Sequence, residues 1–295
     1  MIFTPHRQIQ DRFYITGSGE CNLFLLDAPR PVLFEGGIAC EGRVYAERIK
    51  SYLGGREPKI LFITHAHWDH CGAVGYLKDV FPNMQVAASR ATIDILQRPN
   101  ARRLIEQLNQ DFAEYILQKG EYDYERSMML EETFRSFEVD IELSDGQVVD
   151  LGDGIEVEVM CTPGHTRDHC SFYLPQQKIM IAGEAAGQMQ SSGFISSDFI
   201  SSYDDYLNSF QQLRLKPAEI LCQGHYLAIA GHEAVEQFFA NSLQGLLSFA
   251  ERINAVLDEV DGSVEQCLER LKPPDLLAPL VINMRAQIGY FAKQR

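Results

Sequence analysis

The sequence predicts an α+β fold, and three features of the chain indicate it. Short apolar runs bounded by Gly, Pro or Asp fill the first third, as expected for a sheet of short strands. Strand-like alternation returns after residue 137, whereas helical spacing of apolar residues marks residues 92–137 and the stretch from residue 232. With 295 residues, 45% of them hydrophobic, the chain can bury a large core.

The first strand-rich portion leads into a cluster of histidines. Residues 59–64 form a continuous apolar run, which is typical of a strand buried on both faces. The expected elements before residue 92 are strands at 12–16, 21–26, 31–35, 59–64 and 85–88, with helices at 44–53 and 72–79.

A helical insert separates the two strand-rich portions. Apolar residues at helical spacing predict it over residues 92–137. The second portion has hairpin turns at Asp145-Gly146 and Asp153-Gly154. Its expected strands are 137–143, 147–151, 155–160, 171–174, 178–182 and 219–222, with a serine-rich loop at 191–202.

The C-terminal portion is expected to be helical throughout. Helices are predicted at 232–260 and 263–271, where Ser263 and Gln266 form a capping box, and from about residue 276. We therefore expect a domain over residues 1–231 that includes the insert, followed by a helical cap over residues 232–295.

Charge and cysteine content narrow the function classes. The chain has 41 acidic and 26 basic residues, a net charge of −15, and this disfavours nucleic acid as a partner. No run of 18 apolar residues occurs, so no membrane association is expected, and the N-terminus lacks a signal-peptide pattern. Seven scattered cysteines without a CxxC pair favour a reducing compartment, so we expect a cytoplasmic location.

Four possible metal ligands fall within six residues where the apolar strand ends, in the run His65-Ala66-His67-Trp68-Asp69-His70. Imidazole and carboxylate groups suit zinc, iron or manganese. His65 and His67, two apart on extended backbone, can share one ion, while Asp69 and His70 on the turn can reach a second. Chance would produce this spacing on the order of a few times in ten thousand. Solvated surface histidines are therefore the weaker interpretation.

Three further strand ends carry a residue of ligand type: His165, Glu184 and His225. A glycine directly precedes each of them, which lets the backbone turn sharply and approach a metal closely. Cysteines also lie near these turns, at positions 71, 161 and 222. We interpret them as core residues, because histidines and carboxylates already fill the coordination pattern.

These motifs together resemble the metallo-beta-lactamase superfamily. The resemblance is carried by the HxHxDH run at 65–70, the TPGHT run at 162–166, the carboxylate in Gly183-Glu184-Ala185 and the Gly224-His225 pair. It implies a four-layer αββα sandwich with the metals at one edge of two facing sheets, so that residues 1–231 form the catalytic domain. It further implies one ion on His65, His67 and His165, and a second on Asp69, His70 and His225. Glu184 stands where the family usually has a bridging aspartate, which is a departure.

The two-ion site predicts a metal-dependent hydrolase. Two divalent ions, zinc or iron with manganese also suitable, can hold a bridging hydroxide and polarise a substrate oxygen. Asp69 is placed to orient this nucleophile and to pass its proton to the leaving group. Tyr226 and Tyr203 are candidate donors to the oxyanion, because some family members use a tyrosine in this way. We expect a small acyl substrate: an ester, a thioester or a lactone.

Within the superfamily, the layout of insert and helical tail is most similar to the quinolone-signal response thioesterase-like proteins. The helices then form an apolar cap over the metals, although apolar faces at helical spacing first of all bury helices. Two alternatives stay open. One is an iron-dependent oxidoreductase on the same scaffold, and the other is a regulatory binding protein with a vestigial hydrolase site, acting as a homodimer or with a regulatory protein partner.

Overall fold

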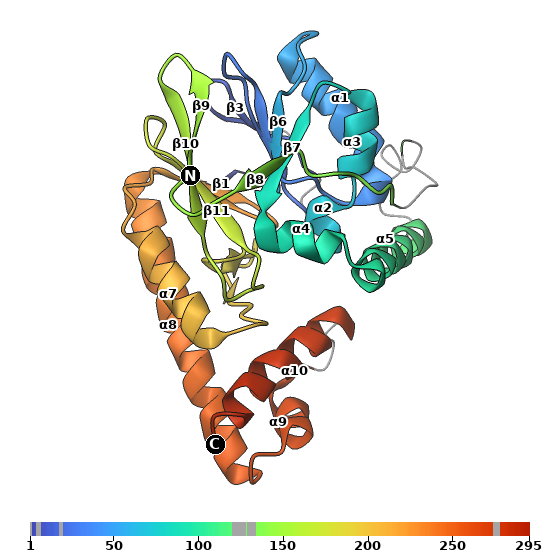
Figure 1. The fold of residues 1–295 in the computed structure, drawn as a ribbon. Coiled ribbons are helices and arrows are strands. Elements are labelled where there is room, and N and C mark those ends of the chain that lie inside the picture. The colour runs from blue at the N-terminus through green and yellow to red at the C-terminus, as the bar shows by residue number, and fades with distance from the viewer. Residues whose placement is uncertain (1, 4–6, 18–19, 120–127, 129–133, 274–277) are drawn as a thin grey trace.

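The structure is a computed structural model that describes residues 2–3, 7–17, 20–119, 128, 134–273 and 278–295. Two sheets face one another, and helices cover the outer side of each, so the layers follow the order α, β, β, α (Figure 1). The α+β fold and the four layers expected from the sequence are confirmed. In the described residues, each sheet has seven strands.

The first sheet is built from the N-terminal half of the chain. It is antiparallel up to β5 and parallel from β5 to β8. Successive side chains of β5 and β6 point to opposite faces of the sheet. Phe34 and Phe62 face the second sheet, whereas Leu61 faces the outer helices. In spatial order, its strands are β2 (Arg7–Gln10), β3 (Phe13–Ile15), β4 (Phe24–Leu26), β5 (Val32–Phe34), β6 (Ile60–Phe62), β7 (Gln85–Ser89) and β8 (Ile141–Leu143).

The second sheet comes mainly from the C-terminal half. Strands β10, β12 and β15 run in one direction, because β11 is antiparallel to both β10 and β12, and β15 is parallel to β12. In spatial order, its strands are β1 (Ile2–Phe3), β16 (Ala228–Ala230), β15 (Ile220–Gln223), β12 (Ile179–Gly183), β11 (Cys170–Leu174), β10 (Ile155–Cys161) and β9 (Val148–Gly152). A separate two-stranded ribbon joins β13 (Gln188–Met189) to β14 (Ile195–Ser196), and β14 lies inside the segment 191–202 that was expected to be a loop.

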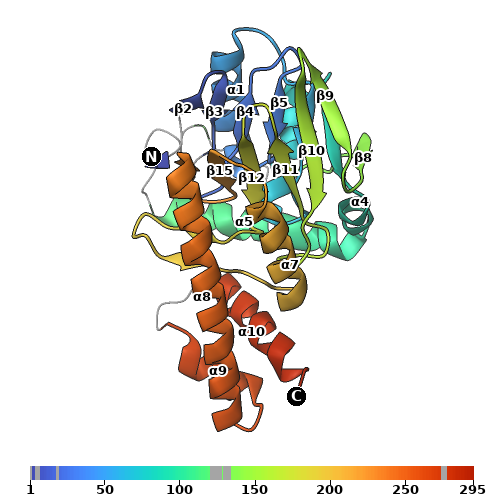
Figure 2. The same ribbon diagram turned by 90° about the vertical axis from the view of Figure 1, so that its left-hand side faces the viewer.

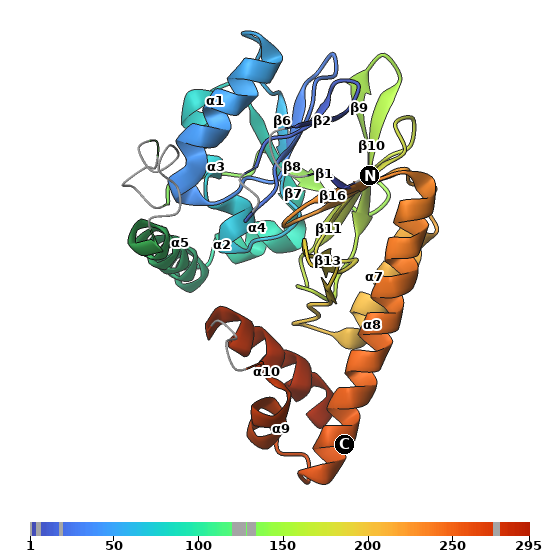
Figure 3. The same cartoon turned by 180° about the vertical axis from the view of Figure 1, so that it is seen from behind.

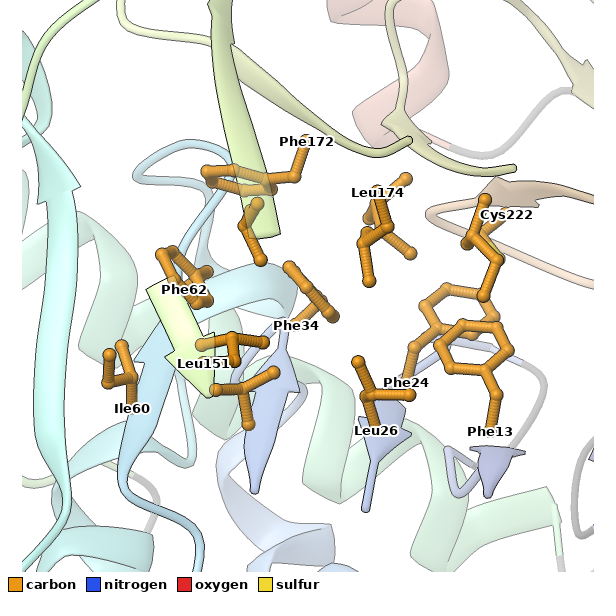
Figure 4. Close-up of a cluster of buried hydrophobic side chains, with 14 of the residues drawn as sticks. Phe13, Phe24, Leu26, Phe34, Ile60, Phe62, Leu151, Phe172, Leu174 and Cys222 are labelled. Atoms are coloured by element: carbon orange, nitrogen blue, oxygen red, sulfur yellow. The ribbon is translucent and has the colours of Figure 1, made fainter. Parts of the chain in front are cut away.

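The core between the sheets is aromatic. The rings of Phe34 and Phe62 from the first sheet and Phe172 from the second lie with centroids 5.1–5.6 Å apart. All three side chains have no exposed surface, and Figure 4 shows them among the aliphatic residues of both sheets. Each such ring contributes roughly 1.5–3 kcal/mol of hydrophobic stabilisation on burial. This packing fixes the two sheets against each other, and therefore also the strand ends at their common edge.

Helices cover the outer faces and extend past the sandwich. The outer side of the first sheet carries η1 (Ala39–Glu41), α1 (Gly42–Leu53), α2 (Trp68–Cys71), α3 (Val74–Val80), α4 (Arg90–Leu96) and α5 (Pro99–Lys119). The second sheet is covered by α7 (Tyr203–Arg214) and the first half of α8 (His232–Glu259). The second half of α8 projects beyond the sheets and packs with α9 (Val264–Leu271) and α10 (Ala278–Ala292) (Figures 2 and 3). None of the helices in the described residues combines the length and the apolar character needed to cross a lipid bilayer.

The helical insert is shorter than the sequence predicts. Helices α4 and α5 account for residues 90–96 and 99–119, but the described residues 134–140 contain no helix. Phe137 and Val139 are half-buried against the first sheet's outer cluster and alternate with the exposed Glu138 and Asp140. A period of two belongs to extended backbone, so the expected helix over 92–137 is wrong at its C-terminal end. Residues 120–127 and 129–133 lie outside the described residues.

Candidate metal centre

Four strand ends from both sheets meet at one edge of the sandwich. The strand β6 leads into the histidine-rich turn, with Thr64 and His65 directly beyond it. On the second sheet, β10, β12 and β15 end at the same edge because they run in the same direction, and they lead to His165, Glu184 and His225. The topology therefore explains why residues far apart in the sequence become neighbours.

A first group of donors consists of His65, His67, His165 and Glu184, whose ligand atoms all lie within 4.8 Å of one another. His67 Nδ1 and His165 Nε2 are 3.2 Å apart. Glu184 Oε1 lies 3.3 Å from His165 Nε2 and 3.7 Å from His65 Nε2. Three imidazoles and a carboxylate at this spacing make a donor set suited to one divalent cation.

A second group adjoins the first through the same carboxylate oxygen. Glu184 Oε1 lies 3.1 Å from His70 Nε2 and 3.4 Å from His225 Nε2. Asp69 Oδ2 lies 3.6 Å from His225 Nε2 and 3.9 Å from His70 Nε2. The structure thus brings together all seven residues named as metal ligands, with Glu184 between the two groups. The sulfur of Cys21 also lies within 4.8 Å of ligand atoms of His70 and His225.

The hydrogen bonding of His65 fits a bound cation. His65 is fully buried, and its Nε2 has no hydrogen-bond partner. Its Nδ1 donates to Thr64 Oγ1 at 2.9 Å, because that hydroxyl itself donates to Glu35 Oε1 at 2.7 Å. The proton is thereby assigned to Nδ1, and Nε2 presents its lone pair to the centre. A buried lone pair without a partner is costly in a protein interior unless a cation or a donor occupies the space beside it.

Glu35 belongs to neither donor group, but its carboxylate lies beside Thr64, which contacts His65, and beside His70. The same Oε1 that accepts from Thr64 lies 3.2 Å from His70 Nδ1. Glu35 is fully buried and has a φ of 76°, in the left-handed region that residues other than glycine rarely adopt. Such strain persists only where the surroundings enforce it, and it often marks functional sites.

Three more residues hold the ligand-bearing turns in place. Asp168 Oδ2 accepts from the backbone N–H of Ala66 at 2.8 Å, which fixes the histidine-rich turn. The backbone carbonyl of Asp198 accepts from His165 Nδ1 at 2.6 Å. His169 Nε2 accepts from the backbone N–H of Glu184 at 3.1 Å, and its Nδ1 lies 2.8 Å from Thr162 Oγ1. Both nitrogens of His169 are therefore engaged, so this ring orients Glu184 instead of binding a cation.

Crowded imidazoles and carboxylates shift one another's pKa values. Burial and the neighbouring His165 lower the pKa of His67 to about 4. Burial also lowers the pKa of His165, but Glu184 and Asp198 outweigh it and raise that pKa to about 9. Burial raises the pKa of Glu184, yet His165 and His225 outweigh it and hold the pKa well below its usual value. The carboxylate is thus ionised, as a carboxylate that binds a cation must be.

Close backbone approach explains the glycine before His225. A Cβ on Gly224 would lie 2.8 Å from His70 Cε1, so any larger residue would push the two ligand turns apart. Gly164, before His165, has a φ of 132°, and a Cβ there would lie 2.2 Å from the backbone of Tyr206 in α7. Both glycines are required where the backbone passes close to a neighbour.

The two tyrosines proposed as oxyanion donors lie in different surroundings. The Tyr226 ring centroid is 5.9 Å from that of His225, its side chain is partly exposed, and its φ is 65°. Tyr203 instead packs against Phe199 and Phe291 in the cluster of C-terminal helices. The position of Tyr226 suits the predicted role, whereas the contacts of Tyr203 are those of a packed aromatic residue. Both roles stay predictions.

The insert contacts the metal-binding turn directly. The rings of Trp68 in α2 and Phe112 in α5 are 5.3 Å apart. Asn109 of α5 is fully buried, donates to the Trp68 carbonyl at 3.1 Å and accepts from the N–H of Ala39 at 2.8 Å. Helix α5 therefore braces the turn that carries four of the ligands.

Sequence reasoning missed four of the residues in and around the centre: Cys21, Glu35, Asp168 and Asp198. Glu35 had a detectable signal, since it ends a buried apolar strand that runs parallel to β6 and so reaches the same edge. Cys21 lies shortly before β4, but nothing in its local pattern sets it apart from the other cysteines. Asp168 and Asp198 act through backbone groups of distant segments, for which a sequence offers no spacing rule.

Comparison with known proteins identifies a family and a shared fold. The sequence model of the metallo-beta-lactamase superfamily matches residues 19–225 of the chain. A protein of Aquifex aeolicus (strain VF5), named only as uncharacterized, is 31% identical over 122 residues, which are 41% of this chain and 46% of that protein. The alignment thus spans just under half the length of that relative.

Solved structures extend the likeness to the whole sandwich. A metallo-beta-lactamase family protein from Thermus thermophilus has a TM-score of 0.66 at 18% identity, covering 97% of this chain and 95% of that one. A motif mutant of the metallo-beta-lactamase from Cronobacter sakazakii has a TM-score of 0.61 at 19% identity, covering 84% and 98%. The sec-alkylsulfatase Pisa1 from Pseudomonas sp. has a TM-score of 0.64 at 13% identity, covering 97% of this chain and 50% of that one.

Proposed function

Because the chain belongs to the metallo-beta-lactamase superfamily, we propose that it is a metal-dependent hydrolase that acts on an ester, a thioester or a lactone. One observation carries the proposal. A single carboxylate oxygen, Glu184 Oε1, lies within 3.7 Å of imidazole nitrogens of four histidines that come from three separate turns. An oxygen shared between two groups of donors is the arrangement that a pair of cations requires.

The chain's own residues define where two cations would be held. His65, His67 and His165 would hold one, His70, His225 and Asp69 the other, and Glu184 would contact both. When bound, a pair of divalent ions supplies an acidified water and a Lewis acid that polarises the substrate oxygen. Zinc or iron suits the imidazole-rich donor set, with manganese also compatible.

Asp69 performs the proton transfer in the proposed reaction. Its side chain keeps 16% of its surface exposed, so water can reach the carboxylate. Its Oδ2 lies 3.6 Å from His225 Nε2, at the edge of the second group of donors. From there Asp69 can accept a proton from the attacking water and return it to an alkoxide or thiolate leaving group. Tyr226, beside His225, is the proposed hydrogen-bond donor to the oxyanion.

Other evidence supports the reaction class and the cellular setting. The Cronobacter and Pseudomonas proteins are hydrolases by name, a lactamase and a sulfatase. All seven cysteines of this chain are free thiols, which supports a reducing, cytoplasmic compartment. The net charge of −15 supports a small-molecule substrate over a nucleic acid.

A panel of substrates on metal-loaded protein tests the proposal. Turnover is measured for an aryl ester, a thioester, a lactone and a secondary alkyl sulfate at equal zinc, iron or manganese content, with oxygen consumption recorded in parallel. We expect hydrolysis of at least one acyl substrate. Oxygen consumption without hydrolysis would favour the oxidoreductase alternative, and cleavage of the sulfate alone would contradict the acyl class.

Replacement of the proton-transfer residue tests the mechanism. Asp69→Asn keeps the side-chain shape but removes the base, so kcat is expected to fall by about 10²–10⁴. Asp111→Asn, on the exposed face of α5, is the matched control and should leave kcat unchanged. Unchanged turnover of Asp69→Asn, at wild-type metal content, would remove Asp69 from the mechanism.

A further inference from the structure

We propose that Cys21 supplies a thiolate ligand to the second cation, beside His70 and His225. The sulfur of Cys21 and ligand nitrogens of both histidines lie within 4.8 Å of one another. The assignment rests on the proposed metal-dependent function and deepens it, because it adds a donor that neither the sequence motifs nor the family match identifies. It also narrows the choice of metal.

The spacing of this group can be compared with the spacing of donors around a bound zinc ion. Zinc binds thiolate sulfur at about 2.3 Å and imidazole nitrogen at about 2.0–2.1 Å, so a sulfur and a nitrogen on one ion lie about 3.6 Å apart. The three donors lie within 4.8 Å of one another, so a movement of roughly 1 Å would bring them to this spacing. Asp69 Oδ2 and Glu184 Oε1 lie within 3.9 Å of Nε2 of the same two histidines and complete the proposed ligand set.

Backbone hydrogen bonds on both sides of Cys21 hold it beside His225. The N–H of Asn22 donates to the Gly224 carbonyl at 2.8 Å, and its side-chain amide donates to the Gln223 carbonyl at 3.2 Å. On the other side, the Glu20 carbonyl accepts from His225 Nδ1. That bond assigns the proton to Nδ1 and leaves Nε2 of His225 as the ligand atom. The three residues 20–22 are therefore tied to the turn that carries His225.

Cys21 differs from its neighbouring cysteines in this contact with two ligands. Its side chain is fully buried and also touches an apolar cluster with Ile38 and Cys40. Cys71, although it directly follows His70, packs into the outer core of the first sheet. In the described residues, Cys21 is the only cysteine that joins a group of metal-type donors.

A thiolate at this position has a chemical consequence. Thiolates favour zinc and other soft or borderline ions, while manganese favours oxygen ligands. The second cation is therefore expected to be zinc in preference to manganese, and the thiolate's negative charge adds to those of Glu184 and Asp69 in balancing two divalent ions.

Cobalt substitution of the full-length chain tests the assignment. Cobalt(II) bound to a thiolate gives a sulfur-to-metal charge-transfer band in the near ultraviolet, which imidazole and carboxylate ligands do not give. We expect the band in wild type and in the control Cys71→Ala, and its loss in Cys21→Ala. The second-step cobalt affinity of Cys21→Ala should fall by at least about tenfold. Retention of the band in Cys21→Ala would overturn the assignment.

A measurement on the wild-type protein does not depend on whether the Cys21→Ala variant folds. X-ray absorption at the zinc edge of the wild type should show a sulfur scatterer at about 2.3 Å. Two zinc ions bound with nitrogen and oxygen scatterers alone would overturn the role of Cys21 and leave the two-cation function intact. A single bound zinc with a sulfur scatterer would support Cys21 as a ligand and contradict the binding of two cations, so the two proposals fail separately.

Discussion

Glu184 is the residue on which the geometry of the centre depends. Its Oε1 contacts both groups of donors although a glutamate is one methylene longer than the aspartate usual at this position. Its backbone N–H is held by His169 Nε2, which fixes where the longer side chain starts. The extra methylene is therefore accommodated without moving the carboxylate away from the shared position.

Protons and metal ions compete for the same imidazole nitrogens, so metal binding is expected to depend on pH. Glu184 and Asp198 raise the pKa of His165 to about 9 against the effect of burial, so in the cation-free protein this ring is protonated at neutral pH. The proton must leave before the ring binds a cation, so the affinity for the cation held by His65, His67 and His165 should increase about tenfold per pH unit between roughly pH 7 and 9 and then level off.

Calorimetry of zinc binding in two buffers with different ionisation enthalpies counts the protons released. His67, whose pKa is lowered to about 4, is already neutral and should contribute none. A zinc affinity that does not change between pH 7 and 9, with no proton release, would contradict the assignment of His165 as a ligand.

The sequence indicated the seven candidate ligands, which the structure brings together, but not the residues that surround them. The seven candidates follow recognisable strand ends and glycines, so a local pattern exposes them. Glu35, Asp168 and Asp198 act on groups 29 to 102 positions away, through contacts that exist only after folding. Cys21 lacked a local signal for the same reason.

At the scale of elements, the turn before His165 packs closely against α7. A Cβ at Gly164 would overlap the backbone of Tyr206, and the φ of 132° disfavours any side chain. Gly164→Ala is therefore expected to lower the free energy of unfolding by about 2–5 kcal/mol. Gly54→Ala, with a φ of 57° and open space around it, is the matched control and should cost only about 1 kcal/mol. Urea unfolding of both variants measures the difference, and equal losses would contradict the close packing of this turn.

The last helix reaches the metal centre through a loop. Asn283 of α10 donates to Asp198 Oδ2 at 2.8 Å, and the buried Gln287, one turn later, donates to the Ser197 carbonyl at 2.8 Å. The Asp198 carbonyl in turn accepts from His165 Nδ1. Helix α10 thus fixes the loop that orients a ligand.

Removing both amides should weaken metal binding without touching a ligand. We predict that the double variant Asn283→Ala, Gln287→Ala binds zinc about tenfold more weakly, because partners that orient ligands are worth about 10–100-fold in affinity. Asn241→Ala, on the exposed face of α8, is the control. Zinc titration against a competing chelator measures the change, and wild-type affinity in the double variant would show that α10 only packs against α8 and α9.

The helices and strands expected from the sequence agree with the structure where the apolar residues follow a single repeat. The buried strands next to the ligands alternate between two apolar cores, and the helices α1, α5 and α8 carry apolar faces at helical spacing. The prediction failed at residues 134–137, where a few aromatic residues fit both a helical and an extended period. Contacts with the outer core of the first sheet decide that segment, and those contacts are not local.

At the scale of the whole molecule, the two halves of the chain each supply one sheet and part of the centre. The aromatic core between the sheets holds β6 against β10, β12 and β15, so the ligands converge only when both sheets pack. The family resemblance that the motifs carry implied the four layers. The packing of α9 and α10 on the far end of α8 was not predictable, because amphipathic helices show which face is buried but not against what.

The most direct test is to count the cations that the full-length, chelator-treated chain binds when titrated with zinc, and to follow its unfolding in the same samples. The donor geometry predicts two zinc ions per chain. At a free zinc concentration one hundred times the dissociation constant, each site should raise the free energy of unfolding by about 2.7 kcal/mol. A chain that binds no zinc, and whose unfolding zinc does not shift, would contradict the convergence of these residues on metal ions.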